Sequence, residues 1–162
     1  MGAVLFFLLL ASVISILTHF YYSRKVKQLL EEIESSYSDS KEPVILINKV
    51  ELKIHYGPKV VPYTAELLLI KDNLIILPFS PPHIRQPSIQ IPSSNNQVTL
   101  TKARFTHVAD NIRIYHREID LHSYRMEDQR WIYIAFTFRF ADEEQMKPLA
   151  DHLGKYYAEF IT

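Results

Sequence analysis

The pattern of apolar and polar positions divides the chain into three parts. Residues 2–23 are almost wholly apolar and contain no Asp, Glu, Lys or Arg. Residues 43–140 largely alternate between apolar and polar positions, which is typical of half-buried strands. Residues 142–160 return to apolar positions three and four apart, which predicts an amphipathic helix. The pattern therefore predicts an apolar helix, a β-rich domain and a closing helix, in that order.

The first apolar segment is long enough, as a helix, to cross a lipid bilayer. At ~1.5 Å per residue, residues 2–23 extend for about 33 Å, against a hydrocarbon core of roughly 30 Å. Arg24, Lys25 and Lys27 follow the segment, and no basic residue precedes it. Positively charged flanks tend to stay in the cytoplasm. The sequence therefore predicts a transmembrane helix over residues 1–23, an outside N-terminus and a cytoplasmic domain, in a single-pass protein of the cell membrane.

A cleaved secretory signal is the alternative interpretation of the same segment. Such signals begin with a basic region and contain about 7–15 apolar residues before a cleavage site. This segment has no basic region before it and is longer, which favours a permanent anchor. If the alternative is right, the segment is cleaved off and the mature protein is exported.

Residues 24–42 are expected to connect this helix to the domain. Residues 24–34 are mainly helix formers, so the membrane helix is expected to continue for two or three turns into water. A dimerisation seam is the alternative, but the apolar stripe is too short for a coiled coil. Residues 35–42 are polar and serine-rich, which is typical of a flexible tether. Residues 43–162 would then form the domain.

Alternation and turn signals divide the domain into six or seven strands. The predicted strands cover residues 50–56, 65–71, 74–79, 89–91, 98–108, 112–122 and 131–140. Asp72 with Asn73, and Asp110 with Asn111, are predicted as turns between strands. The last strand has the clearest alternation, and Asp142 is expected to cap the helix that follows it.

Strands closed by one amphipathic C-terminal helix are the order of elements in pleckstrin-homology-like (PH-like) domains. The chain resembles bacterial PH-like and GRAM-type sequences over residues 67–77, and in the aromatic strand that runs into residues 142–160. The resemblance implies an α+β, mostly β fold, an antiparallel and partly open barrel of six or seven strands closed by the helix. It also implies a scaffold that binds a protein or peptide, often close to a membrane.

Two features differ from that class of domains. Eukaryotic PH domains usually carry a Trp in the closing helix, whereas here Trp131 lies on the preceding strand and the helix carries tyrosines. Members that bind phosphoinositides carry several basic residues around the first hairpin. Here no Lys or Arg lies between Lys59 and Lys71, and only Lys53 lies shortly before them. This argues against recognition of a phosphoinositide headgroup.

Composition excludes several classes of function. The 18 basic residues are balanced by 18 acidic ones, so bulk charge does not favour nucleic acid. The chain has no Cys, which removes disulfides, thiolate zinc sites and Cys nucleophiles. Its three glycines, Gly2, Gly57 and Gly154, are too few for a phosphate-binding loop. The sequence therefore predicts no cofactor and no nucleic-acid partner.

One set of side chains offers candidate chemistry. In the predicted strand 112–122, a period of two places His116, Glu118, Asp120 and His122 on one face. These residue types ligate metals and act in acid–base catalysis. The two His residues would however lie about 20 Å apart at ~3.3 Å per residue, too far to share an ion. A solvated polar face is the favoured interpretation, and a metal hydrolase is the alternative.

The sequence therefore predicts a non-catalytic binding or scaffold protein anchored in the membrane. Its partner is expected to be a protein, met along a sheet face or through the proline-rich residues 78–92. The alternative is an exported, barrel-like protein in which residues 131–140 line a pocket for a small ligand. The candidate interaction residues are aromatic or basic: Trp131, Tyr133, Arg139, Lys53 and Lys59.

Overall fold

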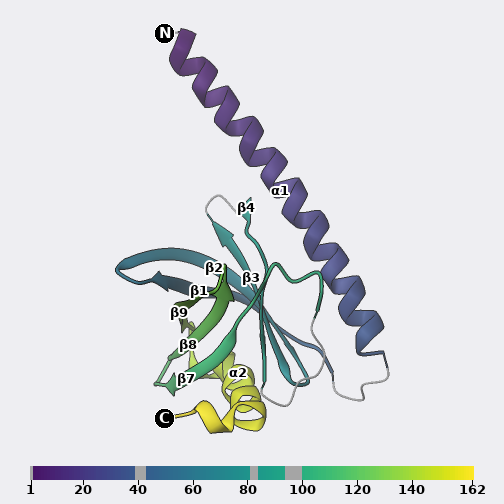
Figure 1. The fold of residues 1–162 in the computed structure, drawn as a ribbon, viewed down its shortest axis with the longest axis vertical. Coiled ribbons are helices and arrows are strands. Elements are labelled where there is room, and N and C mark those ends of the chain that lie inside the picture. The colour runs from purple at the N-terminus through teal and green to yellow at the C-terminus, as the bar shows by residue number, and fades with distance from the viewer. Residues whose placement is uncertain (1, 39–42, 81–83, 94–99) are drawn as a thin grey trace.

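A long helix, a curved sheet and a shorter C-terminal helix make up the described part of the computed structural model, residues 2–38, 43–80, 84–93 and 100–162 (Figure 1). In those residues the sheet has nine strands in the order β6-β5-β3-β2-β1-β9-β8-β7, with β4 paired to β3. The elements are α1 (Gly2–Ser36), β1 (Ile45–Tyr56), β2 (Lys59–Ile70), β3 (Asn73–Ser80), β4 (Ile84–Arg85), β5 (Ile89–Pro92), β6 (Phe105–Thr106), β7 (Val108–Ile114), β8 (Glu118–Glu127), β9 (Arg130–Arg139), α2 (Glu143–Tyr156) and the 3₁₀ turn η1 (Ala158–Phe160).

The sheet forms a nearly closed barrel because one stretch of chain joins its two edges. β6 pairs with β5, and β7, which follows it almost directly, pairs with β8. His107 lies between β6 and β7, and its backbone N–H donates to the Gln90 carbonyl at 2.8 Å. The prediction of a mostly β barrel with a C-terminal helix is confirmed. The described part of the sheet differs from the predicted six or seven antiparallel strands, because it has nine strands and β5 pairs with β6 in parallel.

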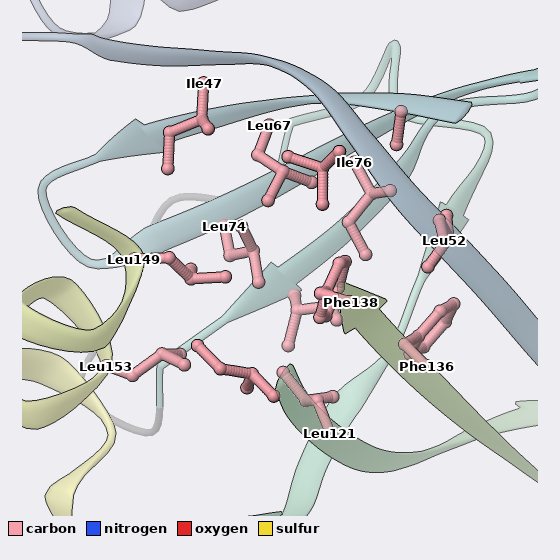
Figure 2. Packing of buried hydrophobic residues seen from close by; sticks show 14 of the residues in the cluster. Ile47, Leu52, Leu67, Leu74, Ile76, Leu121, Phe136, Phe138, Leu149 and Leu153 are labelled. Carbon is pink, nitrogen blue, oxygen red and sulfur yellow. The ribbon is translucent and has the colours of Figure 1, made fainter. Parts of the chain in front are cut away.

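The barrel interior is filled by alternate side chains of the strands and by one face of α2 (Figure 2). Phe136 is fully buried, and Leu149 and Leu153 of α2 pack against the same cluster. Tyr157, at the C-terminal end of α2, is also fully buried, and its hydroxyl donates to the Ile91 carbonyl. Burial raises the pKa of the Tyr157 hydroxyl, which stays protonated. The helix is thereby fixed to the sheet.

A second hydrophobic core lies between α1 and the outer side of the sheet. Val26, Leu29 and Ile33 of α1 are buried there, Leu29 completely. They pack against side chains that point away from the barrel interior: Leu68, Ile70, Ile75, Leu77 and Leu100. β2 and β3 are therefore covered on both faces, which explains why their apolar residues run without interruption.

The expectation that residues 24–34 form a helix end surrounded by water is therefore wrong. The apolar stripe of this segment is short, but it has a sheet face to cover, which a linear pattern does not reveal. Of the predicted tether, Ser35 and Ser36 belong to α1, and residues 39–42 lie outside the described residues.

Buried polar side chains fix the end of α1 to this core. The Tyr37 hydroxyl accepts a hydrogen bond from Asn73 Nδ2 at 2.5 Å, and Asn73 Oδ1 accepts one from Gln90 Nε2 at 2.8 Å. Gln90 Oε1 in turn accepts from the Leu100 backbone N–H at 3.1 Å. Because an unpaired buried polar group costs free energy, this chain of hydrogen bonds specifies how α1, β3 and β5 meet.

Glu32 attaches α1 to the loop that precedes β6. Its Oε1 accepts hydrogen bonds from the Thr101 backbone N–H at 2.8 Å and from the Thr101 hydroxyl at 2.7 Å, and its Oε2 accepts one from the Lys102 N–H at 2.8 Å. Burial alone would raise the pKa of Glu32. The hydrogen bonds outweigh it and hold the pKa below its usual value.

Replacing Glu32 by Gln is expected to lower the free energy of unfolding by about 1 kcal/mol at pH 7, because the hydrogen bonds to a charged acceptor are lost. The folded-state pKa is lowered, so this stabilisation is present above the unfolded-state pKa and is lost as pH falls through the folded-state pKa. Urea unfolding at pH 7 and pH 3 measures the difference. The exposed Glu34→Gln is the control, and a wild-type minus E32Q difference that is equal at both pH values would contradict the attachment.

The prediction of a membrane-spanning helix is wrong. Among the described residues, no helix combines the length and the apolar character that crossing a bilayer requires. The apolar segment is not a separate element, because it forms the first part of α1, which continues to Ser36 and packs its later turns on the sheet (Figure 1). The predicted localisation, a single-pass protein of the cell membrane with a cytoplasmic domain, is corrected for the same reason.

The structure confirms some of the predicted strands and turns and corrects others. The predicted strands at 50–56, 74–79 and 89–91 lie within β1, β3 and β5, and those at 65–71 and 131–140 match β2 and β9 except for their last residue. Asp142 caps α2 by accepting from the Gln145 N–H. Asp110 and Asn111 are not a turn, because they lie inside β7 at a bulge. The chain reverses at residues 115–117 instead, so residues 112–122 are not one strand. The predicted strand at 98–108 is not continuous. Residues 98–99 lie outside the described residues, and among residues 100–108 only those of β6 and the first residue of β7 are in strands.

Candidate functional site

Exposed aromatic side chains gather on the outer face of β8 and β9. The strand register pairs Tyr124 with Tyr133 and Met126 with Trp131. The Tyr124 ring packs edge-on against Trp131 at 5.0 Å between centroids and lies 6.1 Å from the Tyr133 ring. Trp131 is 54% exposed and Tyr133 66%, and Met126 is exposed as well. We call these four side chains the aromatic patch.

The same face becomes charged towards the other end of β9. Arg139 Nη2 donates to Glu118 at 2.8 Å, and the Thr137 hydroxyl donates to Asp120 at 2.7 Å. His55 Nε2 of β1 lies 3.2 Å from the Thr137 hydroxyl. These polar groups satisfy one another across the strands. The aromatic patch is an exposed apolar part of this face.

The structure brings together four of the five predicted interaction residues. Trp131, Tyr133 and Arg139 lie on the outer face of β9, as the alternation predicted, and Lys53 lies on the outer face of β1. Lys59 does not share this face. It pairs with Tyr56, whose side chain belongs to the opposite face of the strand and lines a cavity inside the barrel.

The predicted polar cluster is divided by the turn at residues 115–117. His116 lies in this turn and forms an ion pair with Glu143 of α2. Glu118, Asp120 and His122 remain at alternate positions of β8. Over the described ranges of the chain, no three His, Asp or Glu side chains come together in a way that could hold a metal ion. A single strand face from His116 to His122 therefore does not exist.

The three basic residues that follow the apolar segment lie on the exposed side of α1. Arg24 is exposed, and Lys27 Nζ lies 4.0 Å from Glu31 one helical turn later. Lys25 Nζ lies 5.8 Å from the centre of the Tyr21 ring, and Lys25 borders a hollow between α1 and residues 101–104. These residues belong to the helix that covers the sheet.

A cavity of about 220 Å³ lies inside the barrel at the end away from α2. α2 lies near the start of β1 and the end of β2, whereas the cavity is lined from the end of β1 and the start of β2. Its apolar surface includes Ile54, Ile134 and Phe136. Its polar groups come from Tyr56, Tyr63, Gln86, His107 and Arg125.

His107 is a neutral buried residue at this cavity. It is 1% exposed, its Nδ1 lies 3.2 Å from the Ser123 hydroxyl, and that hydroxyl donates to the Ile134 carbonyl at 3.2 Å. A hydroxyl has one proton, so Nδ1–H must be the donor to Ser123, and Nε2 is the acceptor nitrogen of the ring. Burial, and then the charge of Arg125, lower the pKa of His107 to about 4. The ring is therefore uncharged at pH 7.

Arg125 provides the positive charge of the cavity. Its guanidinium lies over the Phe105 ring, 4.0 Å from the centroid, and its Nη2 donates to Glu127 at 2.8 Å. Its Nε is buried and has no hydrogen-bond partner among the described residues. Burial raises the pKa of both Tyr56 and Tyr63, so their hydroxyls are protonated donors at neutral pH.

The sequence interpretation did not predict a cavity lined by His107 and Arg125. The inward position of Arg125 could have been predicted, because it lies on the same face of β8 as Ile119, Leu121 and Ser123, two residues after the last of them. The burial of His107 could not have been predicted, because it results from the closure of the barrel by residues that are distant in sequence.

Comparisons with known proteins add no relative: no protein-family model matches the chain, and no curated protein is significantly similar to it. The resemblance to PH-like domains stays a prediction. The barrel and its two candidate sites rest on the structure.

Proposed function

We propose that this chain is a non-catalytic binding domain that docks a partner protein on the aromatic patch. The observation that carries the proposal is the exposure of Trp131, Tyr133 and Met126 side by side on the outer face of β8 and β9. Contiguous exposed apolar surface marks interaction sites, and Trp, Tyr and Met are enriched at protein interfaces.

The surroundings of the patch fit a partner that presents an apolar segment. The patch itself carries no charge, and the hairpin between β8 and β9 places Glu127, Asp128 and Arg130 beside it. An apolar centre with a charged rim is the usual anatomy of a protein interface. The outer face of the barrel offers the aromatic rings as an exposed platform.

The contacts of the polar cluster support a role without catalysis. Glu118 is held by Arg139, Asp120 by Thr137, and His116 by Glu143. Acid–base catalysis needs such groups to converge on one reacting atom. Here each group pairs with a different neighbour at a different point of the surface.

Replacing Trp131 by Ser is expected to weaken partner binding by about tenfold or more, because a central Trp often carries 2 kcal/mol or more of binding energy. The matched control is Tyr115→Ser, which removes another exposed aromatic side chain at the opposite end of the sheet face. Titration of the co-purifying partner against wild type and both variants measures the affinities. Equal losses for W131S and Y115S, or no loss for W131S, would contradict the proposal.

A further inference from the structure

We propose that the barrel cavity binds a small carboxylic acid, with its carboxylate at Arg125 and its short apolar chain against Ile54, Ile134 and Phe136. The cavity lies inside the barrel, whereas the aromatic patch lies outside it. The inference therefore does not depend on the proposed protein partner.

The size of the cavity limits the ligand to a small molecule. Its volume of about 220 Å³ equals roughly seven waters at ~30 Å³ each. A monocarboxylate with about six carbons is of this size. Its chain would lie on the apolar surface, where each buried methylene contributes about 0.8 kcal/mol.

The charge of the cavity selects an anion. Among the described residues that line it, Arg125 is the only one with a permanent charge. Its ion-pair partner Glu127 is about half exposed and does not belong to the cavity lining, so the charged group at the described lining is the guanidinium. His107 is neutral and adds no competing charge.

The donors of the cavity select an acceptor. Arg125 lines the cavity, and the nitrogens of its guanidinium group are hydrogen-bond donors only. Guanidinium groups match carboxylates in geometry. Tyr56 also lines the cavity, and its protonated hydroxyl is a second donor. A carboxylate accepts from both kinds of donor, whereas an alcohol offers less charge and fewer acceptor sites.

Titration of the purified full chain with hexanoate, followed by amide chemical shifts, tests this inference. Hexanoate is expected to bind saturably and to shift residues of β1, β8 and β9 around the cavity. The matched neutral probe, 1-hexanol, is expected to bind about tenfold more weakly, because it lacks the charged acceptor. Butanoate is expected to bind more weakly than hexanoate, because fewer methylenes are buried.

Two arginine variants test whether the positive charge that binds hexanoate belongs to Arg125. Arg125→Met keeps much of the side-chain volume and is expected to weaken hexanoate binding by about tenfold. Arg113→Met, at an exposed position of β7, is expected to leave it within about twofold of wild type. Equal binding of hexanoate and hexanol by wild type, or no saturation by about 10 mM hexanoate, would overturn the inference. The comparison of hexanoate with hexanol uses the wild-type protein, so it tests the inference even if R125M does not fold.

Discussion

Replacing Leu29 by Ala is expected to lower the free energy of unfolding by about 3 kcal/mol. Leu29 is completely buried between α1 and the outer side of β2 and β3. Truncating a buried Leu loses its transfer free energy and leaves a cavity, which together cost about 2–5 kcal/mol. Urea unfolding followed by Trp131 fluorescence and by circular dichroism measures the change.

The neighbouring Leu30 provides the matched control for this prediction. It lies on the same turn of α1 but is 42% exposed. Leu30→Ala is expected to change the free energy of unfolding by less than about 1 kcal/mol, because little packing is lost. Similar effects of the two substitutions would show that α1 does not use this face to cover the sheet.

Acidification from pH 7 to pH 4 is expected to remove about 3 kcal/mol of stability through His107. Burial and Arg125 lower its folded-state pKa to about 4, against an ordinary value of 6.5. Between these values the unfolded chain binds a proton that the folded chain does not. Stability therefore falls as pH falls through this window, by about 1.4 kcal/mol for each unit of difference.

Comparison with His107→Gln isolates this effect from other titrating groups. The amide occupies a similar position and does not titrate, so the variant should lose less stability than wild type between pH 7 and pH 4. We expect the wild-type advantage to shrink by about 3 kcal/mol over this range in urea unfolding. His122→Gln, at an exposed position of β8, is the control. An advantage of wild type over H107Q that does not change with pH would contradict the buried neutral histidine.

The parts of the fold that local patterns determine could be predicted from the sequence. Residues 130–139 alternate so regularly that both faces of β9 followed from period two, including the outward positions of Trp131 and Tyr133. Asp142 and the acidic first turn of α2 marked the start of that helix. Each of these features depends on neighbours within a few residues.

The role of α1 could not be predicted because it depends on the strand order. The uninterrupted apolar residues of β2 and β3 fit strands that are covered on both faces, but they do not identify the cover. Residues 24–34 have a short apolar stripe behind a much longer apolar segment, and the longer signal dominated the interpretation. The contact of Leu29 with Leu68 and Ile75 joins segments far apart in the chain.

Only part of the candidate site could be predicted, because the rest depends on contacts between segments that are distant in the sequence. The outward positions of Trp131 and Tyr133 follow from alternation, whereas Tyr124 and Met126 lie beyond the predicted strand 112–122. The polar cluster is split by a turn at residues 115–117 that contains no Gly, Pro, Asn or Asp. Asp110 and Asn111 are favoured turn residues but occupy a bulge within β7. The cavity could not be predicted, because His107 and Arg125 meet only after the barrel has closed.

A photo-crosslinking amino acid at position 133, and in a separate sample at position 115, tests the proposed docking face most directly. Both positions carry exposed tyrosines, but they lie at opposite ends of the sheet face. We predict that position 133 crosslinks to a defined partner protein, that position 115 does not, and that adding Trp131→Ser removes the crosslink. Equal crosslinking from both positions, or a crosslink at position 133 that persists in W131S, would contradict binding through the aromatic patch.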